Sequence, residues 1–167
     1  AHVSMADPVS PRHVDHIAEA AIAEGLTYHR GGTYLAMEGP QFSSLAESKL
    51  YRQWGCDVIG MTNMPEAKLA REAEICYATV AMVTDYDSWH PDHGSVDIQS
   101  IIKVLHANAD NARRLVARLA RELPRTPQPC PVGSDTALEY ALMTAPEARD
   151  PELLAKLDAV AGRVLSR

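Results

Sequence analysis

Two aspartates separated by one residue follow an apolar run in the middle of the chain. The run YATVAMV, residues 77–83, has the composition of a buried strand, and Asp85 and Asp87 come just after it. A carboxyl group that is partly desolvated and close to a second carboxylate has a raised pKa and can donate a proton. The pair is therefore a candidate proton-donating site. The alternative is that both aspartates cap the loop backbone through Asx turns.

Two histidines in the same loop invite a metal interpretation. His90 and His93 stand close to Asp92 and Asp87. An H-x-x-H pair in a loop with nearby carboxylates is only a weak metal signal, so we expect no bound metal.

Similar polar turns follow two further strand candidates. The predicted strands are residues 33–37, 57–61 and 76–84, and the turns are residues 38–43, 62–63 and 85–87. Helical segments separate the strands, which favours an α/β fold with a mixed central sheet flanked by helices. Sites in such folds lie beyond the carboxyl ends of the strands, so the turns mark the expected site.

Capping and glycine signals set the expected helix boundaries. Ser44 and Glu47 form a capping-box pattern, and Gly25 and Gly55 are placed to end helices. The expected helices are residues 12–24, 44–54, 63–75, 97–123, 134–143 and 151–165. The predicted buried stripe of the long helix comprises Ile98, Ile101, Ile102, Leu105, Leu115, Val116, Leu119 and Leu123.

Bulk composition narrows the class of protein. The 167 residues are 46% hydrophobic, enough for one core, and the net charge of −6 argues against a nucleic-acid-binding surface. No apolar run is long enough to span a bilayer, so no membrane partner is expected. Cys56, Cys76 and Cys130 lack C-x-x-C spacing, which favours a reducing, cytoplasmic location over a disulfide framework.

Three motifs in register resemble one family. MEGPQFSSLAES (37–48), DVIGMTNMPE (57–66) and VTDYDSW (83–89) are similar to the purine nucleoside phosphorylase superfamily, most closely to its methylthioadenosine phosphorylase branch. The opening HVSMADPVSP also resembles that branch, so the likeness runs from His2 to about Leu123. It implies an incomplete purine nucleoside phosphorylase-like fold, in which residues 1–167 are the C-terminal portion of a single domain without its N-terminal half.

The same resemblance implies the reaction and the partners. The branch converts 5′-deoxy-5′-methylthioadenosine and phosphate to adenine and 5-methylthioribose 1-phosphate, in purine and methionine salvage. We expect phosphate as a co-substrate, no cofactor, and a homotrimer or a multiple of trimers. The missing N-terminal segment would be a further partner, carrying most of the phosphate site. The chain begins at Ala1 without an initiator methionine, which fits either processing or a piece of a longer protein.

Four residues would read the base in this family pattern. The resemblance places Asp85 against N7 of the departing purine and Asp87 near its exocyclic amine. It stacks Phe42 on the purine ring, although the only Phe of the chain could instead fill the core. Ser43 together with Asp85 suggests a 6-aminopurine, because branches that prefer 6-oxopurines carry Glu and Asn at these positions.

The turn after the second strand would contact the sugar and the phosphate. By resemblance, Met61 packs under the ribose and the Thr62 hydroxyl donates to phosphate near a helix N-terminus. Core filling and a strand-end threonine are the alternatives. Ile59 and Gly60 would complete the wall. Gly60 departs from the branch, which usually has Asn there, and this difference could enlarge the pocket.

An apolar wall would meet the 5′ substituent. In the family, Ile98, Ile101 and Ile102 face it, although helical spacing alone would make them ordinary core residues. His2 matches a histidine that, in trimers of the family, reaches into the pocket of a neighbouring subunit.

Two other functions stay open at the level of sequence. Gly60 keeps a 6-oxopurine nucleoside or methylthioinosine phosphorylase of the same fold in view. A catalytically silent purine-binding or assembly fragment is the alternative from another class, because the resemblance puts the phosphate loop outside this chain.

Overall fold

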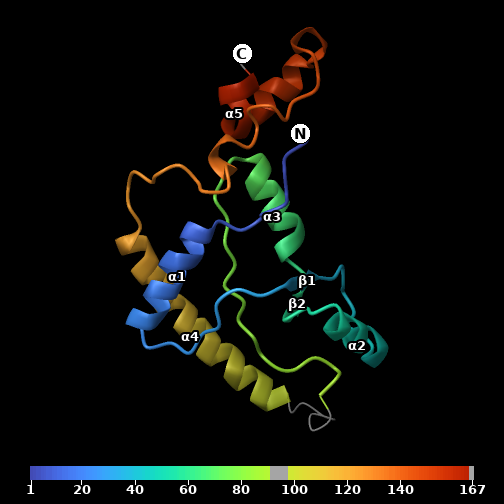
Figure 1. The fold of residues 1–167 in the computed structure, drawn as a ribbon, viewed down its shortest axis with the longest axis vertical. Helices are drawn as coiled ribbons and strands as arrows, with labels where there is room; N and C mark the ends of the chain where they lie inside the picture. The colour runs from blue at the N-terminus through green and yellow to red at the C-terminus, as the bar shows by residue number, and fades with distance from the viewer. Residues whose placement is uncertain (91–97, 166–167) are drawn as a thin grey trace. The chain divides into compact units, whose positions relative to one another are not determined.

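The structure is a computed structural model that describes residues 1–90 and 98–165. The helices and strands are α1 (Pro11–Ala23), β1 (Tyr34–Ala36), α2 (Leu45–Gln53), β2 (Val58–Gly60), α3 (Asn63–Glu72), α4 (Ile98–Glu122) and α5 (Pro151–Leu165) (Figure 1). None of the described helices combines the length and the apolar content that a membrane crossing requires.

The chain divides into two compact units. The terminal unit comprises Ala1–Val14, Met64–Ala78 and Thr126–Arg167, and the sheet unit comprises Asp15–Asn63 and Thr79–Arg125. Nearly all of the predicted site residues fall in the sheet unit, and His2 alone falls in the terminal unit.

Two parallel strands form the centre of the sheet unit. β1 and β2 pair with Leu35 opposite Ile59, and both strands fall inside their predicted ranges. The Asp57 carboxylate accepts a hydrogen bond from the Thr33 N–H at 2.6 Å, which fixes the start of the pair. Helices and a parallel pair in one chain confirm the predicted α/β class.

Local signals set the ends of α2. The Ser44 hydroxyl accepts a hydrogen bond from the Glu47 N–H at 3.3 Å, and the Glu47 carboxylate accepts one from the Ser44 N–H at 2.8 Å. Hydrogen bonds from the Ser44 hydroxyl and N–H also lower the pKa of Glu47. At the other end Gly55 has a φ of 77°, the left-handed conformation that glycine adopts without steric cost. The predicted capping box and stop are therefore confirmed.

The core of the sheet unit lies between α1 and α4. Ala20 and Ala21 of α1 pack against Leu115 of α4, and the two helices run alongside each other in Figure 1. The predicted buried stripe of α4 is only partly correct, because Ile102, Leu105 and Val116 are 47%, 49% and 61% exposed. The apolar period identified an amphipathic helix, but α1 covers only part of that face.

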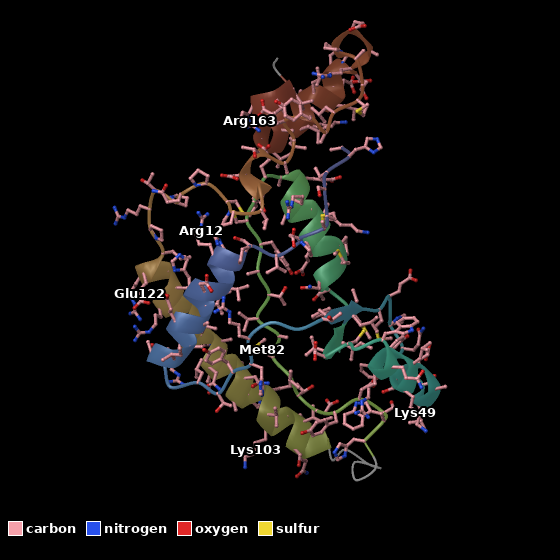
Figure 2. All side chains as sticks on the ribbon, in the orientation of Figure 1. Arg12, Lys49, Met82, Lys103, Glu122 and Arg163 are labelled. Carbon is pink, nitrogen blue, oxygen red and sulfur yellow. The ribbon has the colours of Figure 1, made fainter. Side chains whose placement is uncertain are left out.

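The predicted strand at residues 76–84 does not form. In the part of the chain that the structure describes, the sheet contains only β1 and β2, and residues 76–84 form neither a helix nor a strand. Val80, Met82 and Val83 are exposed, and Figure 2 labels Met82 on this run. A strand requires backbone partners, and strand-forming residue types do not supply them.

Helix α5 closes the core of the terminal unit. Ala161 and Val164 pack with Leu138 and Ala141. The helix predicted at residues 134–143 is wrong, since only a short 3₁₀ turn forms at Ser134–Thr136 and further turns follow it. A second 3₁₀ turn at Pro146–Ala148 precedes α5.

Candidate active site

Direct contacts bring together the three polar turns of the sheet unit. An atom in place of the missing Cβ of Gly39 would lie 2.6 Å from the Met61 sulfur, so the turn after β1 touches the turn after β2. The Ser88 hydroxyl donates to the Ser43 carbonyl at 3.0 Å, which ties the segment beginning at Asp85 to the turn after β1. The turns therefore meet beyond the carboxyl ends of the strands, as the sequence predicts.

Asp85 lies at the surface. Its carboxylate accepts a hydrogen bond from the Thr84 hydroxyl at 2.8 Å, and its side chain is exposed. The expectation of a partly desolvated carboxyl is not met in this chain, because the preceding residues form no buried strand. Asp87 is half-buried and lines a small cavity.

Phe42 and Ser43 have opposite environments. Phe42 is 84% exposed, so the alternative that it fills the core is wrong. Ser43 is 8% exposed, and its hydroxyl donates to the Met37 sulfur at 3.8 Å. The backbone thus presents the ring of Phe42 outwards while it anchors the next residue inwards, which leaves an aromatic face free to stack.

The space beside Gly60 is already occupied. A Cβ at this position would collide with the Tyr34 hydroxyl, which projects from β1 across β2. The expected enlargement of the pocket is therefore not present in this chain, because Tyr34 uses the room that glycine leaves. The sequence reasoning missed Tyr34, although an aromatic residue near a glycine in a paired strand is the signal that could have identified it.

Aromatic residues after Asp85 pack the loop onto α2. The rings of Tyr86 and His90 stack with centroids 4.5 Å apart, and the Arg52 guanidinium lies 3.6 Å from the ring of Trp89. A cation at this distance from an indole face is attracted by the ring quadrupole. These groups position the loop, while His93 and Asp92 of the suggested metal motif lie outside the described residues.

A small cavity separates β1 and β2 from α2 and the loop. Its volume is about 50 Å³, and its lining includes Ile59, Asp87, Ser48 and Trp89. A cavity of this size accommodates only a few water molecules and no purine nucleoside. Ile59 and Asp87 are thus brought together, but at a space too small to hold the substrate.

The remaining site residues are distributed as follows. Met61 is half-buried against Gly39, and Thr62 is exposed just before α3. Ile101 is half-buried, Ile102 is largely exposed, and Ile98 is the first residue of α4. His2 lies in the terminal unit, where its N–H donates to the Ala141 carbonyl at 2.9 Å.

Comparison with known proteins identifies the family of the chain. A sequence profile described as the Phosphorylase superfamily matches residues 1–121. Over 99% of the chain, 72% of residues are identical to S-methyl-5′-thioadenosine phosphorylase of Bradyrhizobium diazoefficiens, and 70% to the protein of that name from Cereibacter sphaeroides. The chain spans 57% of the length of each of these relatives.

The chain is also similar to solved structures of methylthioadenosine phosphorylases. A methylthioadenosine phosphorylase from an antarctic soil metagenomic library matches 96% of the chain with a TM-score of 0.81 and 47% identity, and the match covers 56% of that protein. An enzyme from Schistosoma mansoni, solved with adenine, matches 75% of the chain with a TM-score of 0.66 and 26% identity. By sequence and by fold, this chain belongs to the phosphorylase superfamily.

Proposed function

We propose that the chain provides the base-binding and leaving-group part of a methylthioadenosine phosphorylase. The reaction converts 5′-deoxy-5′-methylthioadenosine and phosphate to adenine and 5-methylthioribose 1-phosphate. This proposal rests on the observation that the three turns meet. The Ser88–Ser43 hydrogen bond and the Met61–Gly39 contact bring them together. The names of the relatives in both comparisons support it.

Cleavage of the glycosidic bond makes two demands on the protein. The sugar becomes positively charged and the departing purine becomes electron-rich, so a donor near N7 stabilises the transition state. Asp85 would supply that proton or hydrogen bond. Phosphate oxygen attacks the anomeric carbon as the bond to the base breaks, and Thr62 would donate a hydrogen bond to the phosphate. No metal or organic cofactor takes part in this scheme.

The environment of Phe42 suits a purine. A free aromatic face gains from burial and from offset stacking when a flat base covers it. A base in that position would also exclude water from the exposed side of Asp85, which strengthens a hydrogen bond between them. Asp87 would then assist at the exocyclic amine, with Ser43 next to Phe42 in the same turn.

The sugar would lie against residues that follow β2 and begin α4. Met61 and Ile59 offer apolar contact to the ribose, with Gly60 between them. Ile98, Ile101 and Ile102 would face the methylthio group, and such a wall disfavours a charged 5′ substituent. In a homotrimer, His2 of one subunit would complete the pocket of another.

Residues 76–84 are a candidate binding site for a companion segment. They form an apolar run outside the two-stranded sheet of the described residues, the side chains of Val80, Met82 and Val83 are exposed, and the relatives are longer than this chain. We propose that the N-terminal part of a protein of that length pairs with this run, buries it and carries the phosphate loop. This assembly would work in the cytoplasm, where the substrates of salvage are found.

Release of free base is the direct test. Purified chain, with and without the N-terminal part of the Bradyrhizobium relative, is incubated with methylthioadenosine and phosphate, and adenine is measured by chromatography. Release that requires phosphate is expected, at least with the added segment. Faster release of hypoxanthine from inosine or methylthioinosine would instead support the 6-oxopurine alternative.

The silent alternative predicts a different pattern. Adenine would bind, as calorimetry detects, but no base would be released under either condition. Replacement of Asp110 by Asn is a matched control for substitutions at Asp85, because Asp110 is an exposed carboxylate of the same unit that pairs with Arg113 on α4.

A further inference from the structure

Two thiols lie together in the terminal unit, outside the proposed site. Cys76 follows α3 and Cys130 precedes the first 3₁₀ turn, and the two thiols lie close enough for each to shift the pKa of the other. Two contacts of Ser10 also show that the segments carrying the two thiols are close together. Its N–H donates to the carbonyl of Tyr77, the residue after Cys76, and its hydroxyl lies 3.6 Å from the Cys130 sulfur.

Arg12 bridges the two segments that carry these thiols. Its guanidinium lies 4.0 Å from the Cys76 sulfur and donates to the Pro129 carbonyl at 2.8 Å. Figure 2 labels Arg12 at the beginning of α1. A fixed cation at this point favours a thiolate in the pair.

The surroundings of the thiols differ. Cys130 is 7% exposed and donates to the Ser134 hydroxyl at 3.3 Å, whereas Cys76 is half-buried. Burial by itself raises the pKa of Cys130, but hydrogen bonding with the side chains of Ser134 and Cys76 and with the N–H groups of Val132 and Ser134 outweighs it and lowers the pKa to about 6. Burial and the neighbouring Cys130 raise the pKa of Cys76.

We propose that Cys76 and Cys130 are a reversible redox pair that a small peroxide converts to a disulfide. The Cys130 thiolate attacks one oxygen of hydrogen peroxide, the O–O bond breaks, and hydroxide leaves and is protonated to water. The Cys76 thiol then loses its proton and attacks the sulfenic sulfur of Cys130, and the hydroxyl group leaves with that proton as a second water. The protein loses two electrons and the peroxide gains them.

Hydrogen peroxide is the expected oxidant because it is small enough to reach a nearly buried thiolate. A thiolate is the reactive form of cysteine, and a nearly buried one is accessible to peroxide far more readily than to a bulky disulfide. An adjacent thiol that captures the sulfenic acid protects Cys130 from further oxidation. A reducing compartment is compatible with such a pair, because small thiols return a reversible disulfide to two thiols by exchange.

The bond would link the beginning of the run at residues 76–84 to the segment before Ser134. Both cysteines belong to the terminal unit, so the cross-link does not require the two units to approach. Closure of a long loop restricts the unfolded chain, and we expect the midpoint of thermal unfolding to rise by about 10 °C.

Peptide mapping after peroxide treatment tests the proposal. The reduced protein is exposed to stoichiometric hydrogen peroxide, remaining thiols are alkylated, and digested peptides are identified by mass spectrometry. We expect a cross-linked peptide pair containing Cys76 and Cys130 and a whole-chain mass lower by two hydrogen atoms, both reversed by dithiothreitol. Recovery of both cysteines as alkylated thiols, or a cross-link through Cys56, overturns the proposal.

Substitutions sharpen the assignment. Cys76→Ser should stop the reaction at a sulfenic acid on Cys130, which dimedone traps, whereas Cys130→Ser should leave Cys76 reduced. Cys56→Ser is the matched control, because Cys56 is a half-buried cysteine of the sheet unit, and it should cross-link like the unaltered chain. Trapping on Cys76 in place of Cys130 would contradict the assigned roles, and mapping of the unaltered chain does not depend on how any variant folds.

Discussion

Individual residues of the candidate site are positioned by contacts between the turns of the sheet unit. Ser43 is held through its carbonyl by Ser88, and Met61 is held by contact with Gly39. Phe42 and Asp85 remain exposed. The chain therefore presents a half-open site, in which the groups proposed to meet the purine are accessible and their neighbours are fixed.

Asp85 provides the sharpest prediction at this scale. In protein that releases adenine, Asp85→Asn should lower kcat by about 10²–10⁴-fold, because the departing base loses its proton donor. Steady-state kinetics with circular dichroism as a check on folding measures the effect. The control Asp110→Asn should change kcat little, and near-normal turnover in Asp85→Asn would refute the leaving-group role.

The contact between Gly60 and Tyr34 gives a second prediction. Gly60→Ala should lower the free energy of unfolding by about 1–3 kcal/mol, because the added methyl group meets the Tyr34 ring in a paired strand. Tyr34→Val makes room, so the double variant should recover much of that loss. Chemical denaturation of the single and double variants gives the coupling energy, and additive effects would show that the two residues do not share this space.

Secondary-structure elements follow the sequence where their signals are local. The Ser44–Glu47 capping box and the glycine after Trp54 define α2 without help from the rest of the chain. The extended run at residues 76–84 and the first half of α4 depend on partners distant in sequence. There the apolar pattern indicates a surface suited to burial, but it does not specify which segment covers that surface.

Glu74, just after α3, is joined to Arg163 of α5 by an ion pair. Glu74 has a φ of 56° and accepts hydrogen bonds from Arg163 at 2.5 Å and from the Leu138 N–H at 2.9 Å. Burial by itself raises the pKa of Glu74, but these hydrogen bonds and the charge of Arg163 outweigh it, so the pKa lies below its ordinary value of 4.5. The ionised carboxylate thus stabilises the terminal unit above that value, and the stabilisation is lost as the pH falls through the lowered pKa.

Replacement of this carboxylate should remove that pH dependence. Glu74→Gln should lower the free energy of unfolding at pH ~7 by about 2 kcal/mol. The difference from the unaltered chain should shrink as the pH falls below about 4.5, which urea denaturation across the acid range measures. Glu72→Gln replaces an exposed carboxylate at the last residue of α3 and is the control, and an equal loss in both variants would refute the specific role of Glu74.

The whole molecule is shorter than its relatives and divides into two units. It spans 57% of the protein from Bradyrhizobium diazoefficiens, and its two units have separate cores. The sheet has two described strands, while an apolar run without a strand partner leads to the proposed proton donor. At this scale the proposed companion segment has a defined place to bind.

Hydrogen exchange can detect that binding. Addition of the N-terminal part of the Bradyrhizobium relative should slow amide exchange at residues 77–83 by at least about tenfold, because strand pairing protects backbone N–H groups. Exchange within α5, in the terminal unit, serves as the internal reference and should stay unchanged. Equal exchange at residues 77–83 with and without the segment would contradict pairing at this run.

The sequence by itself determined the family, the α/β class, the ends of α2 and the identity of the polar turns. These depend on motifs, caps and glycines that act within a few residues, so local chemistry suffices. Only the tertiary structure decided that Tyr34 fills the space beside Gly60, that residues 76–84 lack a strand partner in the described chain, and that Phe42 faces outwards. Each of these depends on which distant backbone or side chain lies alongside, and residue type alone does not specify that neighbour.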